Sequence, residues 1–315
     1  MDSYRPRRAL LYVPASSEKM LQKLPSMQAD CVVLELEDGV ALPSKQQART
    51  NAVNWLNNRP TEMSCVELGL RVNSAASGLI EEDVKTIASA SNQPDSFMIP
   101  KIDDIETLHV VWQTFTNNYG KESIKRMIAN DTRWVAWIES ARALLDMPQI
   151  LNAARNMHKA GDFFRLDAVV FGSDDFCASI GATRTSQGEE TLYARQRFVT
   201  CAKAHGLQAI DSVYIDLKDM DGLRRQSEQG FAWGFTGKQV IHPSQVPVVH
   251  QAFSPSSKQA QWATELIAEY ERHQTEGKGA MTFRGQMIDR PLLLQAQNIV
   301  KMLSIIEKNS VSSVR

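Results

Sequence analysis

Charged side chains stand where short apolar runs of this sequence end. Glu35, Glu37 and Asp38 close the second such run, Arg71 lies near the end of the third, and Lys101 follows the fourth. Carboxylates gathered in one place are costly unless a cation neutralises them. A divalent cation would do so, which makes these positions candidates for a metal site or for its surroundings.

Further acidic positions supply the candidate metal ligands. Glu139 ends the fifth apolar run, and Asp174 and Asp175 follow the sixth. A few carboxylates without a cluster of histidine and cysteine favour Mg²⁺ over Zn²⁺, because Mg²⁺ takes one or two carboxylates and keeps positions for water and substrate oxygens. A solvated loop charge or a helix cap is the competing explanation for any one of these residues taken alone.

The apolar runs predict eight strands separated by amphipathic stretches of helix length. They cover residues 8–14, 31–38, 67–73, 96–101, 134–139, 167–172, 209–215 and 232–235. Strands buried on both faces that alternate with helices indicate parallel βαβ units, and eight such units predict an α/β fold, a closed (β/α)₈ TIM barrel. An open doubly wound sheet is the alternative, but no glycine-rich phosphate loop follows the first strand. In a barrel the strand ends meet at one mouth, where the active site lies.

The chain is expected to divide into a barrel domain, residues 1–250, and a C-terminal helical extension, residues 251–315. In the extension a helical pattern at 257–276 is broken at 277–279, and residues 281–283 have strand character. The final helix carries an apolar stripe at helical spacing, made of Leu292, Ala296, Ile299, Leu303 and Ile306. A barrel covered by eight helices has little room for this stripe, so we expect it to pack on a neighbouring subunit.

The composition argues against several classes of partner. Of 315 residues, 43% are hydrophobic and the formal net charge is −1, so the chain has a large core and no overall field that attracts nucleic acid or an anionic membrane. Positive charge is only local, at Arg5, Arg7 and Arg8 and at Lys19 and Lys23. No apolar run approaches the roughly 20 residues of a membrane-spanning helix. The four cysteines form no C-x-x-C pair, which favours free thiols, and the early first strand leaves no room for a leader peptide within this sequence.

Six short motifs carry a resemblance to a known family. They are residues 7–14, 36–40, 70–73, 171–176, 235–243 and 287–291. Each motif is only moderately specific, but in this order and at these spacings they are strong together. The sequence resembles, nearly from end to end, the citrate lyase β-subunit-like family of pyruvate-binding barrel lyases, which includes citramalyl-CoA and malyl-CoA lyases.

The resemblance implies a Mg²⁺-dependent carbon–carbon lyase that cleaves citramalyl-CoA to acetyl-CoA and pyruvate. Malate-synthase-like condensation of acetyl-CoA with glyoxylate or pyruvate is a related activity that it also implies. The metal ligands fall on Glu139 and Asp175, because the family's Gly-x-x-Asp-Phe pattern places its aspartate directly before Phe176. Arg71 would bind the keto acid and stabilise the developing enolate.

Asp289 has two interpretations that are compatible. Its place in Ile-Asp-Arg-Pro, before an apolar helix, is typical of a helix N-cap. The resemblance instead makes it the general acid–base residue, delivered into the barrel of a neighbouring subunit by the C-terminal segment. It further implies a homotrimer, and a location in the mitochondrial matrix, because the animal members of the family are mitochondrial.

The resemblance places CoA against Tyr12, Lys19, Lys23 and the pair Gln239 and Val240. The two lysines are four residues apart, on one helical face, and can meet CoA phosphates as point charges. A solvated helix face competes with this interpretation for the lysines, and core packing competes with it for Tyr12 and Val240.

Glu37 and Asp38 are interpreted as residues behind the metal ligands, where they hold metal-bound water or Lys101. Three other functions remain open from the sequence. One is a pyruvate-dependent class II aldolase that acts on free aldehydes and needs no CoA site. Another is a citrate lyase β-type subunit that depends on an acyl carrier. The third is a catalytically inactive binding module, against which the presence of Glu139, Asp175, Arg71 and Asp289 argues.

Overall fold

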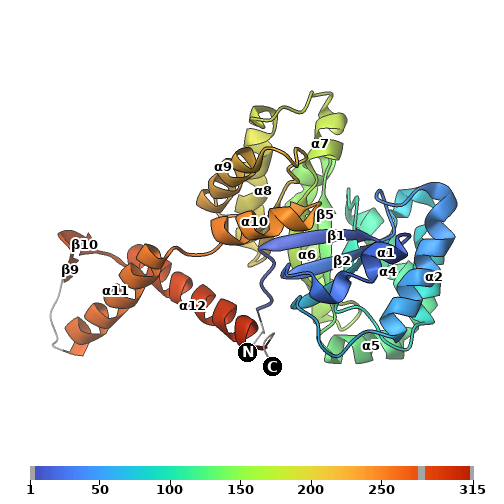
Figure 1. Cartoon of the computed structure of the whole chain (residues 1–315), viewed down its shortest axis with the longest axis horizontal. Coiled ribbons are helices and arrows are strands. Elements are labelled where there is room, and N and C mark those ends of the chain that lie inside the picture. Colours follow the sequence, from blue (N-terminus) through green and yellow to red (C-terminus); the bar gives the residue numbers. More distant parts are fainter. Residues whose placement is uncertain (1–3, 276–280, 313–315) are drawn as a thin grey trace.

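Eight parallel strands close into a barrel in the order of the sequence, and β1 pairs with both β2 and β8. The computed structural model describes residues 4–275 and 281–312 (Figure 1). The strands are β1 Ala9–Pro14, β2 Cys31–Glu35, β3 Glu67–Arg71, β4 Ser96–Ile99, β5 Arg133–Ile138, β6 Arg165–Phe171, β7 Gln208–Asp211 and β8 Gly237–Val240. The predicted (β/α)₈ barrel is confirmed.

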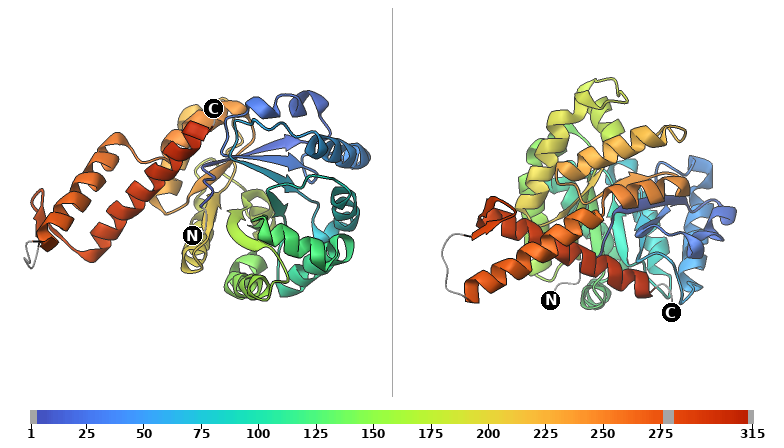
Figure 2. Two further views of the ribbon diagram at one scale, coloured as in Figure 1. Left: turned by 90° about the horizontal axis from the view of Figure 1, so that it is seen from below. Right: turned by 60° about the vertical axis from the view of Figure 1, so that its left-hand side comes forward.

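Helices surround the barrel on its outer side (Figure 2). They are α1 Glu18–Leu21, α2 Lys45–Asn57, α3 Ile80–Ala88, α4 Ile105–Tyr119, α5 Lys121–Ala129, α6 Ala141–Lys159, α7 Ser173–Ile180, α8 Leu192–Ala204, α9 Met220–Ala232 and α10 Val246–Ala252. Helix α10 packs against β1, β8 and α9. None of the helices in the described part of the chain is long and apolar enough to cross a membrane.

The strands are buried on both faces, and this is why the sequence shows them as continuous apolar runs. Successive side chains of a strand point to opposite faces. In β2, Val33 belongs to the cluster that fills the inside of the barrel, whereas Val32 and Leu34 pack against the surrounding helices. The four cysteines are free, as predicted, and three of them are buried.

The position predicted for the eighth strand, residues 232–235, is wrong. Helix α9 ends at Ala232, and β8 begins only at Gly237. The apolar signal failed because β8 buries polar side chains. Lys238 is fully buried, where its Nζ donates to Gln226 Oε1 at 2.6 Å and lies 3.6 Å from Asp211 Oδ2. A strand held by polar contacts gives no hydrophobic pattern to detect.

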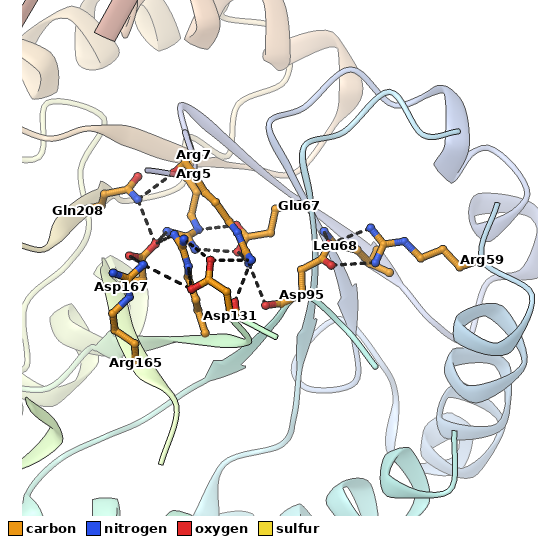
Figure 3. A network of polar contacts seen from close by, with 11 residues as sticks. Arg5, Arg7, Arg59, Glu67, Leu68, Asp95, Asp131, Arg165, Asp167 and Gln208 are labelled. Atoms are coloured by element: carbon orange, nitrogen blue, oxygen red, sulfur yellow. Dashed lines mark hydrogen bonds and ion pairs between the residues drawn. The ribbon is translucent and has the colours of Figure 1, made fainter. Parts of the chain in front are cut away.

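A network of paired charges closes the N-terminal end of the barrel (Figure 3). Arg7 donates to both oxygens of Glu67, at 2.5 and 2.7 Å, and to Asp167 Oδ2 at 2.6 Å. Arg133 donates to the same Asp167 oxygen at 2.9 Å. We call this network the barrel floor, and it consists of Arg5, Arg7, Glu67, Asp131, Arg133, Arg165 and Asp167. Buried charges are tolerated there because each faces opposite charges.

The chain leaves the barrel after α10 and forms a projecting helical hairpin, which we call the arm (Figures 1 and 2). It consists of α11 Ser257–Thr275, β9 Met281–Phe283, β10 Gln286–Ile288 and α12 Arg290–Ser312. The predicted helix, short strand and final helix are therefore present, although the predicted helix break at 277–279 lies outside the described residues. Within the arm, Ala296 of the apolar stripe is buried against Ala263 and Leu266 of α11, so part of the stripe is covered by the arm itself.

Candidate active site

A cavity of about 430 Å³ opens at the C-terminal ends of the strands, and we call it the mouth cavity. Of the residues predicted for the site, Tyr12, Asp38, Arg71, Glu139, Asp175 and Gln239 line it. A larger cavity of about 510 Å³ lies beside α9 and is lined by none of them. The barrel therefore brings together residues far apart in the sequence, at the end where barrel enzymes carry their active sites.

Arg71, the last residue of β3, is fixed at the wall of the mouth cavity. Its Nε lies 2.5 Å from Glu35 Oε2, and its Nη1 lies 3.2 Å from Glu37 Oε2. Its guanidinium carbon also lies 4.7 Å from the centre of the Tyr12 ring. A planar guanidinium held in this way is suited to bind a carboxylate through paired N–H groups.

Glu139 follows β5 and is nearly buried, with 5% of its surface exposed. Its Oε1 accepts a hydrogen bond from the backbone N–H of Lys101 at 2.8 Å. Its other side lies against Gly172, where an added Cβ would come within 2.2 Å of Oε2. Glycine after β6 therefore leaves the space that the Glu139 carboxylate occupies.

The two aspartates after β6 differ in their partners. Asp174 forms an ion pair with Arg184, whose guanidinium also donates to the backbone carbonyl of Val213. Asp175 lies 3.8 Å from Lys101 Nζ and is partly exposed in the mouth cavity. The geometry thus engages Asp174 with Arg184 and leaves Asp175 in the mouth cavity, and the choice of Asp175 as the metal ligand stays a prediction.

The electrostatics of the mouth favour a bound cation. Burial, followed by the nearby carboxylates of Glu37 and Asp175, raises the pKa of Glu139 to about 8. Burial is also the main reason that the pKa of Glu37 rises to about 7. Neither oxygen of Glu37 accepts a hydrogen bond from the described residues. Excess carboxylate of this kind is stabilised by a positive ion.

The residues present fit Mg²⁺. The described residues contain no group of three or more histidine, cysteine, aspartate or glutamate side chains arranged to hold a metal. Mg²⁺ does not require such a group, because it binds through one or two carboxylates and completes its shell with water and substrate oxygens. Glu139 and Asp175 are the two carboxylates that would hold it.

Gln239 ties the C-terminal ends of several strands together. Its Nε2 donates to the carbonyls of Phe171 and Asp211 at 3.0 and 3.2 Å, and its Oε1 accepts from the Tyr12 hydroxyl. The Val240 side chain instead belongs to the core between the strands and the helices. Of this predicted pair, only Gln239 lines the mouth cavity.

Lys19, Lys23 and Asp38 are exposed at the surface. Lys19 on α1 and Lys23 just after it are exposed and do not line the mouth cavity. The Asp38 side chain is 60% exposed, and its Oδ1 lies 3.7 Å from Lys101 Nζ. Glu37 lies 3.4 Å from the same Nζ, so the predicted contact of Glu37 and Asp38 with Lys101 is present.

Asp289 is an N-cap, as its sequence context predicts. Its Oδ1 accepts a hydrogen bond from the backbone N–H of Leu292 at 3.0 Å. The carboxylate is exposed and does not line the mouth cavity. The hairpin of β9 and β10, which directly precedes it, lies at the end of the arm remote from the barrel (Figures 1 and 2).

Sequence reasoning assigned no individual role to Glu35, Trp137 or Arg184. Glu35 anchors Arg71, and Trp137 lies in the wall of the mouth cavity, where its Nε1 is 3.4 Å from Gln239 Oε1. The position of Glu35 at the end of a strand is a signal that sequence analysis can use. Arg184 lies in a loop beyond α7, and nothing in the sequence indicates its ion pair with Asp174.

Comparison with known proteins identifies relatives of this chain. The chain is 46% identical to the mitochondrial citramalyl-CoA lyase of Homo sapiens, over 97% of this chain and 88% of that protein. A citrate lyase from Burkholderia xenovorans LB400 matches with a TM-score of 0.78 at 17% identity, covering 99% of this chain and 97% of that one.

The protein CitE of Mycobacterium tuberculosis, solved with magnesium, acetoacetate and coenzyme A, matches with a TM-score of 0.68 at 24% identity. The match covers 95% of this chain and 98% of that one. The profile of the HpcH/HpaI aldolase/citrate lyase family matches residues 8–243. These residues include all eight strands of the barrel and every residue predicted for the site except Asp289. The chain therefore belongs to the HpcH/HpaI aldolase/citrate lyase family.

Proposed function

We propose that this chain is a Mg²⁺-dependent carbon–carbon lyase that cleaves citramalyl-CoA into acetyl-CoA and pyruvate. The observation that carries the proposal is that Arg71 and two carboxylates, Glu139 and Asp175, line one cavity of about 430 Å³. This arrangement occurs in a chain 46% identical to a citramalyl-CoA lyase over nearly its whole length. The Mycobacterium tuberculosis protein, which shares the fold, was solved with magnesium and coenzyme A.

Each group in the mouth has a defined task in this proposal. Mg²⁺, held by Glu139 and Asp175, would supply Lewis-acid polarisation of the hydroxyl or keto oxygen at the reacting carbon. Arg71 binds the carboxylate of the acid portion, and its contacts with Glu35 and Tyr12 keep the guanidinium in place. Because the Arg71 guanidinium is already oriented, it stabilises developing negative charge without reorganising.

Asp289 is proposed as the general acid that protonates the acetyl-CoA enolate after the carbon–carbon bond breaks. In the reverse direction it would remove a proton from the acetyl-CoA methyl group, so that condensation with pyruvate or glyoxylate becomes possible. Its own chain holds this carboxylate on the arm, between β10 and α12, and outside the mouth cavity. We therefore propose a homotrimer in which the arm of one subunit brings Asp289 to the mouth of another.

CoA would lie across the rim of the mouth. Lys19 and Lys23 are exposed and follow the C-terminal end of β1, so they would be available for the phosphates. Tyr12 and Gln239 would face the thioester end, because both line the mouth cavity. A mitochondrial location is proposed because the similar citramalyl-CoA lyases of human, rat and mouse are named mitochondrial.

The test is release of acetyl-CoA and pyruvate from citramalyl-CoA, measured in a coupled assay with Mg²⁺ and with EDTA. Release that depends on Mg²⁺ supports the reaction and the metal together. A folded protein that binds Mg²⁺ but releases neither product contradicts the proposal. Activity with free aldehydes would then indicate a class II aldolase, and activity only with a carrier-bound substrate would indicate a citrate lyase β-type subunit.

A further inference from the structure

Lys101 has a backbone conformation that residues with side chains rarely adopt. Its φ is +52°, two residues after the end of β4 at Ile99. The left-handed region is unfavourable for residues other than glycine, asparagine and aspartate, and such a residue persists only where its surroundings fix it. In this conformation the Lys101 N–H donates to Glu139 Oε1 at 2.8 Å.

The side chain of the same residue reaches the other carboxylates of the mouth. Lys101 Nζ lies 3.4 Å from Glu37 Oε1, 3.7 Å from Asp38 Oδ1 and 3.8 Å from Asp175 Oδ1. Lys101 therefore contacts both proposed metal ligands, Glu139 through its backbone and Asp175 through its ammonium group. The oxygens of Glu37 accept no hydrogen bond among the described residues, and its negative charge is compensated by the nearby Lys101 and Arg71.

We propose that Lys101 is a positioning residue with two separable effects on the metal site. Its N–H orients the Glu139 carboxylate toward the mouth cavity, which favours metal binding. Its ammonium group neutralises Asp175 and Glu37 until a divalent cation enters, and it thereby competes with that cation. The inference rests on the proposed Mg²⁺ site, and it adds a residue that controls how tightly the site binds its ion.

The competition follows from charge and distance. The ammonium group of Lys101 lies 3.8 Å from Asp175 Oδ1. A metal ion held by Glu139 and Asp175 would therefore share the Asp175 carboxylate with this ammonium group. Two cations beside one carboxylate repel each other, so Lys101 Nζ must move toward Glu37 and Asp38 when the metal enters. Removal of the ammonium group should therefore tighten metal binding, whereas displacement of the backbone N–H should weaken it.

Two variants without the ammonium group separate the effects. Lys101→Gly accepts the left-handed backbone and keeps the N–H in place, whereas Lys101→Val opposes this backbone because its side chain is branched at Cβ. The measurement is the Kd for Mg²⁺, obtained by calorimetry on metal-stripped full-length protein without a CoA ligand. We expect Lys101→Gly to bind Mg²⁺ about two- to five-fold more tightly than the wild type. We expect Lys101→Val to bind roughly ten-fold more weakly than Lys101→Gly.

The possible outcomes distinguish the proposed metal site from the two proposed effects of Lys101. If the wild type binds no Mg²⁺, the metal site of the proposed function is wrong. If the wild type binds and Lys101→Gly binds equally or less tightly, the competing role of the ammonium group is overturned. Equal affinities of the glycine and valine variants overturn the role of the N–H. Lys101→Ala replaces the valine variant if the latter does not fold, and Glu139→Gln is the control that should lose Mg²⁺ binding.

Discussion

Both ends of the barrel bury acidic and basic side chains, but the acidic side chains are fully paired at the floor and in excess at the mouth. At the floor, Glu67 and Asp167 accept hydrogen bonds at 2.5 to 2.9 Å from buried arginines. At the mouth, Glu37 accepts no hydrogen bond among the described residues, and Glu139 is buried beside like charges. At the floor, the arginines compensate the negative charges, whereas the mouth has excess carboxylates that an added cation would stabilise.

This difference shows how one barrel separates stability from chemistry. Paired charges at the floor fix the N-terminal ends of the strands, because removal of either partner would leave an uncompensated buried charge. At the mouth, carboxylates outnumber the arginine and lysine side chains that face them, and this excess negative charge reduces stability until a ligand binds, which is the usual consequence of a site shaped for function. Substitutions at the floor should therefore change stability alone, and those at the mouth should change activity first.

The largest expected effect is on the activity of Glu139→Gln. Loss of a metal ligand should lower kcat/KM by roughly 10³-fold or more, since the metal contributes several kcal/mol of transition-state stabilisation. The metal-free variant should unfold at the same temperature as the wild type or higher, because the substitution removes a carboxylate buried among like charges. Steady-state kinetics measure the first effect and calorimetric unfolding the second. A variant that is inactive because it is less stable would contradict the division between a mouth for activity and a floor for stability.

Asp289→Ala should lower turnover roughly 10²- to 10⁴-fold, the usual contribution of a general acid–base residue. Binding of a CoA ligand should persist, because Asp289 lies outside the mouth cavity of its own chain. Co-expression of Asp289→Ala with Glu139→Gln should restore activity. A mixed oligomer then contains mouths with intact Glu139 served by arms with intact Asp289. Absence of restored activity in isolated mixed oligomers would contradict the proposed delivery from a neighbouring subunit.

At the floor, Glu67→Gln should lower the free energy of unfolding by about 3–5 kcal/mol, because it leaves the buried Arg7 without its main partner. The kcat of the folded protein should stay unchanged. Urea unfolding at fixed protein concentration, followed by circular dichroism, measures the loss. The matched control is Glu122→Gln, which removes an exposed ion pair with Lys125 and should have no measurable effect.

The comparison also explains how far sequence analysis could go. Seven strands and the positions at the mouth follow from apolar runs that end in charge, because buried parallel strands must be apolar. The floor could not be predicted in the same way. Arg7 appears in the sequence as part of a local basic cluster, and its partners Glu67 and Asp167 are 60 and 160 residues away. The separation of Asp174 from Asp175 likewise depends on Arg184, a contact that only the fold reveals.

Lys19 and Lys23 test whether the rim of the mouth belongs to the active site. Replacement of either by alanine should raise KM for the CoA substrate by about two- to five-fold with kcat unchanged, as expected for exposed ion pairs. The effect should shrink as salt is added, because salt screens exposed charges. Lys125→Ala on α5, at the floor end of the barrel, is the control that should leave KM unaffected. An equal effect from the control would mean that overall charge, rather than the rim, determines KM.

The two ends of the barrel should also differ in the sign of the pH dependence of stability. Burial raises the folded-state pKa of Glu139 from 4.5 to about 8 and that of Glu37 from 4.5 to about 7. The stability of the metal-free fold should therefore fall as the pH rises from about 4.5 to about 8, because the folded state binds more protons than the unfolded state in this range. Burial alone would raise the pKa of Asp167, but Arg7 and Arg133 outweigh it and hold that pKa below 3.8. The stability that Asp167 contributes is thus fully present above pH 3.8 and is lost only at lower pH.

Calorimetric unfolding between pH 5 and 8.5 in EDTA should therefore show that stability falls as the pH rises, because of the mouth carboxylates. Asp167 should contribute no change of stability with pH in this range. Mg²⁺ should flatten the profile, because a cation favours the ionised carboxylates that protons would otherwise occupy. Glu139→Gln should reduce the slope in EDTA, whereas Asp167→Asn should lower stability evenly across this range. If the slope in EDTA is unchanged by Glu139→Gln, then the mouth carboxylates do not carry the excess charge that distinguishes them from the floor.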